Sequence, residues 1–276
     1  MKTLGLALSG GAAKGLAHVR VYETLLKHNI KISSISGASA GALYGAMIAF
    51  GYSPTDMLEI INKFPFFKSR IFRLMCVNWN MFNPYRWHPG MFKLNRLYKY
   101  LNDEVFMNIN IEDLEIPLIL SYTDIVENKT GYRTCGNLAE AVVYSMTFPL
   151  MFRSYNDRFY DGGLQSNCPV PALKEAYNPD YILAVDVTSI SSNKENFRKD
   201  LFTFISRVFD VIWKDTFVED LKYADMLIEP ELKGIGFFDF HRYQEVSKLV
   251  DTVFDKDKIK KLISDLNSEG VVAVDL

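Results

Sequence analysis

Short apolar runs alternate with amphipathic stretches over the first fifty residues of the chain. Thr3–Leu8 is short and apolar enough for a buried strand, and Leu16–His28 carries apolar residues at helical spacing. A second strand, "KISSIS" at Lys31–Ser36, is followed by a second helix at Ala40–Phe50. This order of strand, helix, strand and helix predicts a parallel sheet joined by right-handed crossovers.

The same alternation continues to the end of the chain. Further strands are predicted at "IPLILSYTDI" (Ile116–Ile125), at "RFYDG" with its end at Asp161, at "DYILAVDV" from Asp180 and at "ADMLIEP" from Ala224. Helices are predicted over Leu94–Leu101, Leu138–Ser145 and Phe197–Asp220, and twice between Tyr243 and the C-terminal region. No internal repeat or low-complexity linker interrupts this pattern, so we expect one α/β domain.

Composition and charge exclude several classes of protein. A chain of 276 residues buries roughly 75% of its unfolded surface on folding, and a net charge of −2 gives no field that would recruit nucleic acid. The N-terminal apolar stretch is too short and glycine-broken for a signal peptide, and no stretch reaches the roughly 18 apolar residues of a membrane span. The cysteines, Cys76, Cys135 and Cys168, have no zinc-ligand spacing. We expect a cytoplasmic protein without a metal.

A glycine-rich loop lies between the first strand and the first helix, in "LALSGGAAKGLAHV". Gly10–Gly15 nearly matches the G-x-G-x-x-G loop that binds dinucleotides, but Ala12 replaces the middle glycine. No acidic residue ends the second strand to hold a ribose, and Leu16 stands where a P-loop requires lysine. The sequence therefore argues against a nucleotide, and the N–H groups of this loop remain for another negative charge.

The segment Gly37–Gly41, "GASAG", matches G-x-S-x-G, the turn that raises a serine between a strand and a helix. Ser39 is the candidate nucleophile, and such a residue needs donors for the developing oxyanion and a base for its proton. Since neighbouring parallel strands end at the same sheet edge, both loops meet there. The candidate oxyanion donors are the N–H groups of Gly10, Gly11, Ala12 and Ala40.

Two arrangements would supply the base. His241 follows Ser39 and Asp161 in the order of an α/β-hydrolase triad, but a serine at position 39 is early for that fold and His241 leads into a helical segment. Asp161 alone is favoured, because a strand delivers it and Gly162 and Gly163 then turn the chain without bulky side chains. The other histidines, His18, His28 and His88, have ordinary structural interpretations.

Three ordered blocks, "LALSGGAAKGLAHV", "SGASAG" and "FYDGGLQSNCPV", resemble those of the patatin-like phospholipase family, and "SMTFPLMF" resembles its proline-containing segment. The resemblance implies a three-layer sandwich with helices on both faces of a mainly parallel sheet. It implies one domain over residues 1–276, with a catalytic core at about 4–174 and an extension at about 175–276 that completes the fold. It also implies a Ser39–Asp161 dyad without histidine, an oxyanion loop at Gly10, Gly11 and Ala12, and no cofactor.

The loop departs from the family pattern at one position. The family usually has a third glycine where this chain has Ala12, so the N–H is kept but a Cβ is added. If the backbone there requires a positive φ, alanine is strained. Lys14 stands where the family carries Arg or Lys. The other motif-supporting residues are Gly15, Gly37, Gly41, Gly162 and Gly163.

The resemblance predicts a hydrolase of lipid acyl esters, of the phospholipase A or lysophospholipase type. The alternatives are a lipid acyltransferase and a catalytically weak lipid-binding or scaffolding protein. A lipid substrate calls for contact with a membrane, and Phe64–Phe92 contains nine aromatic residues and four Lys or Arg without an acidic residue. This stretch is either a peripheral membrane contact or part of the core, and Leu201–Trp213 is a weaker candidate.

Overall fold

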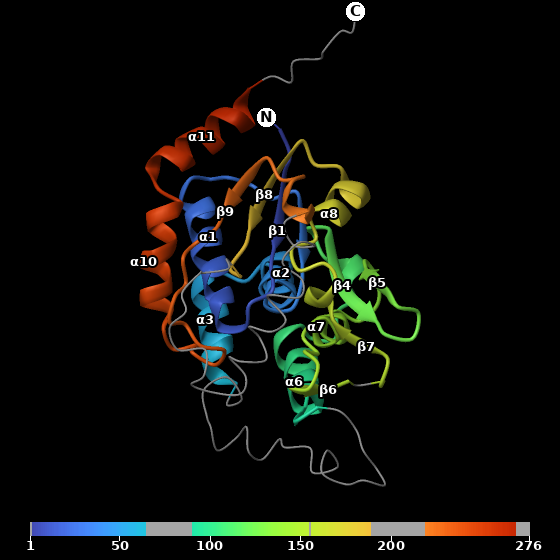
Figure 1. Ribbon diagram of the computed structural model, residues 1–276. Helices are drawn as coiled ribbons and strands as arrows, with labels where there is room; N and C mark the ends of the chain where they lie inside the picture. Colours follow the sequence, from blue (N-terminus) through green and yellow to red (C-terminus); the bar gives the residue numbers. More distant parts are fainter. Residues whose placement is uncertain (1, 65–89, 155, 189–218, 269–276) are drawn as a thin grey trace, which may run out of the picture.

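The fold is that of a computed structural model, which describes residues 2–64, 90–154, 156–188 and 219–268. Its main sheet has the strand order β5-β4-β2-β1-β8-β9, with β7 also paired to β4 (Figure 1). The strands β4, β2, β1, β8 and β9 run parallel, whereas β5 and β7 run antiparallel to β4. Their bounds are β1 Leu4–Leu8, β2 Ser34–Gly37, β4 Leu118–Asp124, β5 Lys129–Arg133, β7 Phe159–Asp161, β8 Tyr181–Val185 and β9 Met226–Ile228.

Helices cover both faces of this sheet. They are α1 Leu16–Lys27, α2 Ala40–Phe50, α3 Pro54–Lys63, α6 Asn95–Tyr100, α7 Leu138–Ser145, α8 Val170–Tyr177, α10 Tyr243–Val253 and α11 Lys256–Asn267. A small second sheet pairs β3 Phe92–Lys93 with β6 Phe152–Arg153. Helix α10 lies along α1 at one side of the molecule (Figure 1).

Side-chain alternation along β1 divides the interior into two cores. Leu4, Leu6 and Leu8 pack in the larger core, which includes the buried residues of α1 and α2. Ala7 belongs to a smaller core on the other face, where it joins Leu173 of α8. The expected arrangement of a mostly parallel sheet between helical layers is therefore confirmed.

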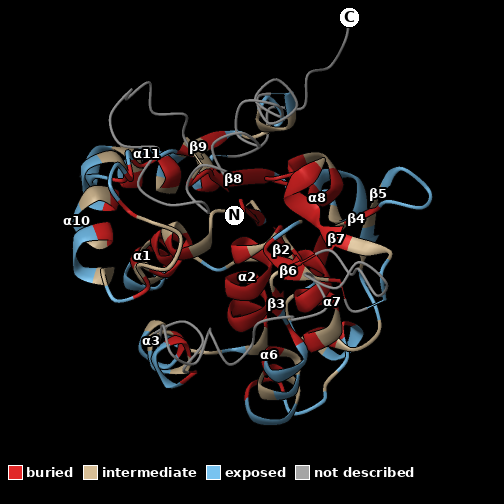
Figure 2. Cartoon of the chain, turned by 60° about the horizontal axis from the view of Figure 1, so that its bottom comes forward, coloured by how far each residue is buried: buried red, intermediate tan, exposed pale blue. Residues whose placement is uncertain are grey.

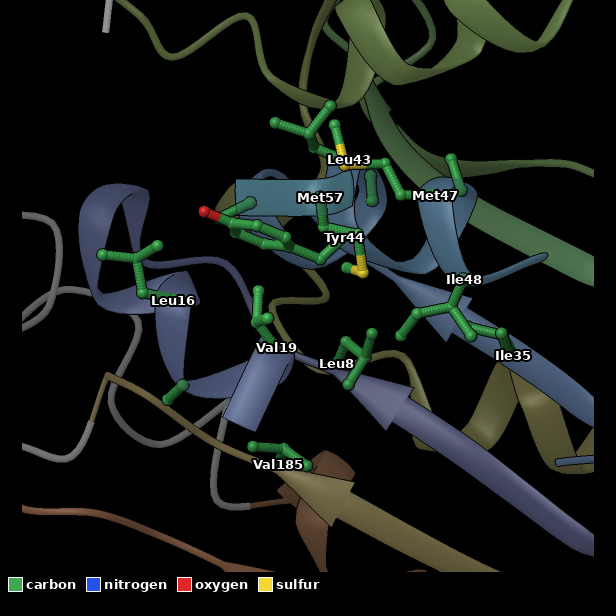
Figure 3. Packing of buried hydrophobic residues seen from close by; sticks show 14 of the residues in the cluster. Leu8, Leu16, Val19, Ile35, Leu43, Tyr44, Met47, Ile48, Met57 and Val185 are labelled. Carbon is green, nitrogen blue, oxygen red and sulfur yellow. The ribbon is translucent and has the colours of Figure 1, made fainter. Parts of the chain in front are cut away.

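Helix α2 lies deep in the larger core because its residues are small. All of its residues from Ala40 to Ala49 are buried, and Figure 2 shows it buried on every side while α3 and α10 have exposed sides. A Cβ on Gly41 would stand 2.1 Å from the carbonyl oxygen of Leu8, so glycine alone allows this approach to β1. Figure 3 shows Leu8, Val19 and Tyr44 meeting in this core. The helix that begins after Ser39 is thus held firmly.

Several elements differ from the sequence-based expectations. Helices α3 and α8 and strand β5 were not predicted, and the helix expected to end at Leu101 gives way to a π-helical turn over Leu101–Val105. The predicted helix at Phe197–Asp220 and the aromatic stretch Phe64–Phe92 lie mostly outside the described residues. Within the described parts of the chain, every helix is too short or too polar to cross a bilayer.

Candidate active site

Ser39 occupies the turn between β2 and α2 in a strained conformation. Its φ of 52° and ψ of −116° lie outside the regions that an L-residue favours, as at a nucleophile elbow. A Cβ on Gly37 would be only 2.4 Å from the carbonyl oxygen of Gly41, so the turn can close this tightly only with glycine at position 37. The Ser39 N–H donates to Oγ of Ser145 on α7 at 2.9 Å. Ser39 as a whole is half-buried.

The register of β4 brings Asp161 to this turn. Strand β2 pairs with the first part of β4, with Gly37 opposite Leu120, and β5 occupies the other edge of β4. Strand β7 therefore pairs with the remaining part of the same edge as β2, with Asp161 opposite Tyr122. Because β2 and β7 run in opposite directions along this edge, their C-terminal ends meet. Ser39 comes just after β2 and Asp161 ends β7, so the two residues lie where these strand ends meet.

The Asp161 carboxyl is buried, with 2% of its surface exposed. Burial raises its pKa from the ordinary 3.8 to about 7, against the opposing effects of the Ser39 hydroxyl and the Gly163 N–H. Oδ1 accepts the Gly163 N–H at 2.8 Å, whereas Oδ2 has no hydrogen bond of standard geometry within the described residues. The Ser39 hydroxyl is near enough to act on the carboxylate, and bonds of this kind often tighten only when substrate binds.

The glycine loop lies directly against Ser39. A Cβ on Gly10 would be 3.0 Å from Cβ of Ser39 and 2.6 Å from Oδ1 of Asn167. The Gly10 N–H donates to the Asn167 carbonyl at 3.1 Å, so this group is already paired in the structure, and its use as an oxyanion donor stays a prediction. Glycine at position 10 also allows the loop to pack closely against Ser39 and Asn167.

The N–H groups of Gly11, Ala12 and Ala40 have no acceptor within the described residues. Those of Ala12 and Ala40 open helical segments, where the first N–H groups have no intrahelical partner. Ala12 has a φ of 51°, so the backbone strain that the family comparison suggested for an alanine is present. Within the described residues, three N–H groups on these two loops are thus left free.

The remaining motif residues shape the turns. A Cβ on Gly15, Gly162 or Gly163 would come within 2.8 Å of a neighbouring heavy atom. A Cβ on Gly11 would approach Val187 to 2.5 Å. The Lys14 N–H donates to the Gly11 carbonyl at 3.1 Å, which closes the loop into its first helical turn.

The histidines do not complete a triad. His241 is exposed, and its charged neighbour is Asp239 rather than Asp161. His18 is buried on α1, where Nε2 lies 2.8 Å from the Ser9 carbonyl oxygen. His28 is exposed at the end of α1, and His88 lies outside the described residues. No described contact joins any of them to Ser39 or Asp161.

Sequence reasoning missed two residues that support the site. Asn167 lies in the third sequence block, so its position there was a usable signal for a role beside the Asp161 turn. Ser145 gave no signal, because a serine at the end of an amphipathic helix is common. Within the described residues there is no cluster of three or more His, Cys, Asp or Glu side chains that would hold a metal ion.

A serine on a strained strand–helix turn, a buried carboxylate and free N–H groups beside them are the parts of a serine ester hydrolase. The family model described as patatin-like phospholipase matches residues 6–174, so the chain belongs to that family.

The chain is also similar to curated lysophospholipases and to a solved structure. The chain is 29% identical over 191 residues to lysophospholipase NTE1 of Cryptococcus neoformans, covering 68% of this chain and 11% of that protein. It is 23% identical over 303 residues to lysophospholipase NTE1 of Meyerozyma guilliermondii, covering 98% of this chain and 20% of that protein. The chain thus spans a small part of these curated relatives. VipD from Legionella pneumophila aligns at 14% identity with a TM-score of 0.49, covering 92% of this chain and 67% of that one.

Proposed function

We propose that this chain hydrolyses acyl esters of lipids, with Ser39 as the nucleophile and Asp161 as the general base. The observation that carries the proposal is the buried Asp161 carboxyl, whose pKa of about 7 suits a base working near neutral pH, beside a serine on a strained turn. The N–H groups of Gly11, Ala12 and Ala40 would bind the oxyanion. Membership of the family and likeness to lysophospholipases support a lipid substrate.

In the first half of the reaction, Oγ of Ser39 attacks the ester carbonyl carbon while Asp161 takes the hydroxyl proton. The carbonyl oxygen becomes an oxyanion, and each N–H that faces it lowers the barrier by about 3 kcal/mol. When the tetrahedral intermediate collapses, the bond to the leaving alcohol breaks and protonated Asp161 returns the proton to that oxygen. The product is an acyl ester on Ser39.

In the second half, Asp161 takes a proton from water as the water oxygen attacks the acyl carbon. The same N–H groups bind the second oxyanion, and collapse releases the fatty acid while the proton returns to Oγ of Ser39. A carboxyl with a pKa near the working pH serves both steps, because it must accept and release a proton in each. No further group is required to balance either half.

The substrate class implies contact with a lipid surface, and Phe64–Phe92 remains the proposed contact on its aromatic and basic composition. A cytoplasmic location at such a surface is proposed because Cys135 and Cys168 are free thiols, which suit a reducing compartment. An acyltransferase would use the same dyad with a second alcohol in place of water. The scaffolding alternative corresponds to a site that binds lipid without turnover.

Labelling with a fluorophosphonate probe tests the nucleophile. Wild-type chain and Ser33→Ala should be labelled, whereas Ser39→Ala should not. Ser33 is a suitable control because its hydroxyl bonds the Leu4 carbonyl before β2 begins, at the edge away from the site. Peptide mapping should place the probe on Ser39. An unlabelled wild-type chain that is well folded would refute the proposal.

A panel of short esters and lysophospholipids, with and without an added alcohol, tests the reaction. Asp161→Asn should lower kcat by at least 100-fold, whereas His241→Ala should leave it unchanged. Loss of activity in His241→Ala without loss of fold would restore the triad. Formation of a new ester with the added alcohol, in place of free acid, would identify a transferase.

A further inference from the structure

Ser9, which joins β1 to the glycine loop, is fixed at every polar atom. Its N–H donates to the carbonyl of Val185 at 3.0 Å. Its hydroxyl donates to the Gly10 carbonyl at 3.1 Å and accepts the N–H of Val187 at 2.9 Å. Its carbonyl oxygen lies 2.8 Å from Nε2 of His18. The last of these partners comes from the helix at the far end of the loop.

The tautomer of His18 follows from this contact. The Ser9 carbonyl oxygen can only accept, so Nε2 must carry the proton and donate it. Nδ1 is buried and has no hydrogen-bond partner within the described residues. Burial lowers the pKa of His18 to about 4, so the ring is neutral at pH 7. The ring of Tyr44 stands edge-on to that of His18, at 6.1 Å between centroids.

The hydrogen bond closes the loop across its base. Ser9 is the last residue before the loop and His18 lies in the first turn of α1, so the contact fixes the distance between the two ends of Gly10–Gly15. The free N–H groups of Gly11 and Ala12 lie two and three residues beyond Ser9. Ala12 also holds a positive φ, a conformation that persists only where surrounding contacts impose it.

We infer that His18 is a positioning residue for the oxyanion loop. By donating Nε2–H to the Ser9 carbonyl, it holds the Gly11 and Ala12 N–H groups where the oxyanion forms. The inference rests on the proposed hydrolase function. His18 takes no part in proton transfer, because Nε2 is engaged by Ser9 and the ring is fully buried without contact to Ser39 or Asp161.

Loss of this hydrogen bond should act on turnover rather than on binding. The loop contacts the oxyanion that exists only during reaction, and a displacement of about 1 Å in such a group lowers the rate by about 100-fold. His18→Leu fills a similar volume without a donor. His18→Gln places an amide nitrogen near the position of Nε2 and restores a donor.

The control variant is Val21→Ala. Val21 is equally buried on α1, three residues further from the loop than His18, and has no polar side-chain atom to bond Ser9, so its truncation destabilises the fold without removing the hydrogen bond. Each variant is assayed with a short ester at a temperature where circular dichroism shows it to be folded. Amide exchange of residues 10–13 is measured by mass spectrometry in the same samples.

We expect His18→Leu to lower kcat by about 100-fold with KM changed by less than threefold, and His18→Gln to recover at least tenfold of that loss. Val21→Ala should keep the wild-type kcat although its melting temperature falls. Amides of residues 10–13 should exchange faster in His18→Leu than in Val21→Ala. Wild-type kcat in folded His18→Leu, or equal loss in Val21→Ala, would overturn the inference. If the wild-type chain shows no Ser39-dependent turnover, the proposed function fails, and the exchange rates alone decide whether His18 holds the loop.

Discussion

Replacing Asp161 with asparagine should stabilise the protein at alkaline pH while it abolishes turnover. The carboxyl is buried with little to balance its charge, and its pKa is about 7 instead of the ordinary 3.8. Ionisation therefore opposes folding. Asparagine has nearly the same shape, keeps an oxygen that can accept the Gly163 N–H and carries no charge. The variant removes the energetic penalty and the base together.

The size of this effect follows from linkage. Between pH 4 and pH 7 the folded chain holds a proton on Asp161 that the unfolded chain has lost, so unfolding releases a proton and stability falls as pH rises. At 1.36 kcal/mol per pKa unit, the difference between 3.8 and about 7 amounts to about 4 kcal/mol, fully expressed above pH 7. We expect Asp161→Asn to gain about 2–4 kcal/mol at pH 8 and almost nothing at pH 4.

Urea unfolding followed by circular dichroism at pH 4 and pH 8 measures both values. Asp124→Asn is the matched control, because Arg158 pairs with this carboxylate of the same sheet and lowers its pKa to about 2. That variant should lose stability at pH 8, the opposite sign. Equal effects of Asp161→Asn at the two pH values, or a loss at pH 8, would show that Asp161 is not buried as a poorly compensated charge.

Three further outcomes are expected. The kcat/KM for a short ester should fall about tenfold per pH unit below pH 7, as Asp161 gains its proton, and a rate that stays level down to pH 5 would contradict this assignment. Ala12→Gly should raise the free energy of unfolding by about 0.5–1 kcal/mol in urea titrations, since glycine adopts a φ of 51° without strain, and kcat should not fall. A fragment of residues 1–178, which contains the whole family match, should aggregate and melt without cooperativity, because it lacks β8 and so leaves one edge of β1 unpaired; a cooperative melt would contradict the single-domain proposal.

Local patterns in the sequence were enough to predict the strand–turn–helix units and the two catalytic candidates. The runs before the glycine loop and before Ser39 are short and apolar, and the residues after them have helical spacing, so each unit is defined within about twenty residues. The small residues around Ser39 and after Asp161 likewise mark tight turns without any tertiary information. The parallel direction of the first two strands then followed from the helix that connects them.

Contacts between segments far apart in the sequence could not be predicted from these local patterns. The sequence does not indicate that the Gly10 N–H is taken by the Asn167 carbonyl, since those residues are brought together only by the completed sheet. Nor does it indicate that β7 runs antiparallel on the edge that β2 leaves free, which is what carries Asp161 to Ser39. Strand β5 was missed because "KTGYR" is mostly polar and lies at an edge of the sheet, where little of it is buried.

Backbone strain and an unfavourably buried carboxyl both occur at the candidate active site, and the surrounding structure keeps them in place. Ser39 and Ala12 both hold a positive φ near 50°, at about 1–3 kcal/mol each, and Asp161 adds about 4 kcal/mol when ionised. Their sum is comparable to the whole stability of many domains, about 5–15 kcal/mol. Such a site persists because α2 is buried throughout and Ser9 is fixed at each polar atom. Loosening either support would let the loops relax before the sheet opens, so activity should be lost at lower denaturant concentration than fold.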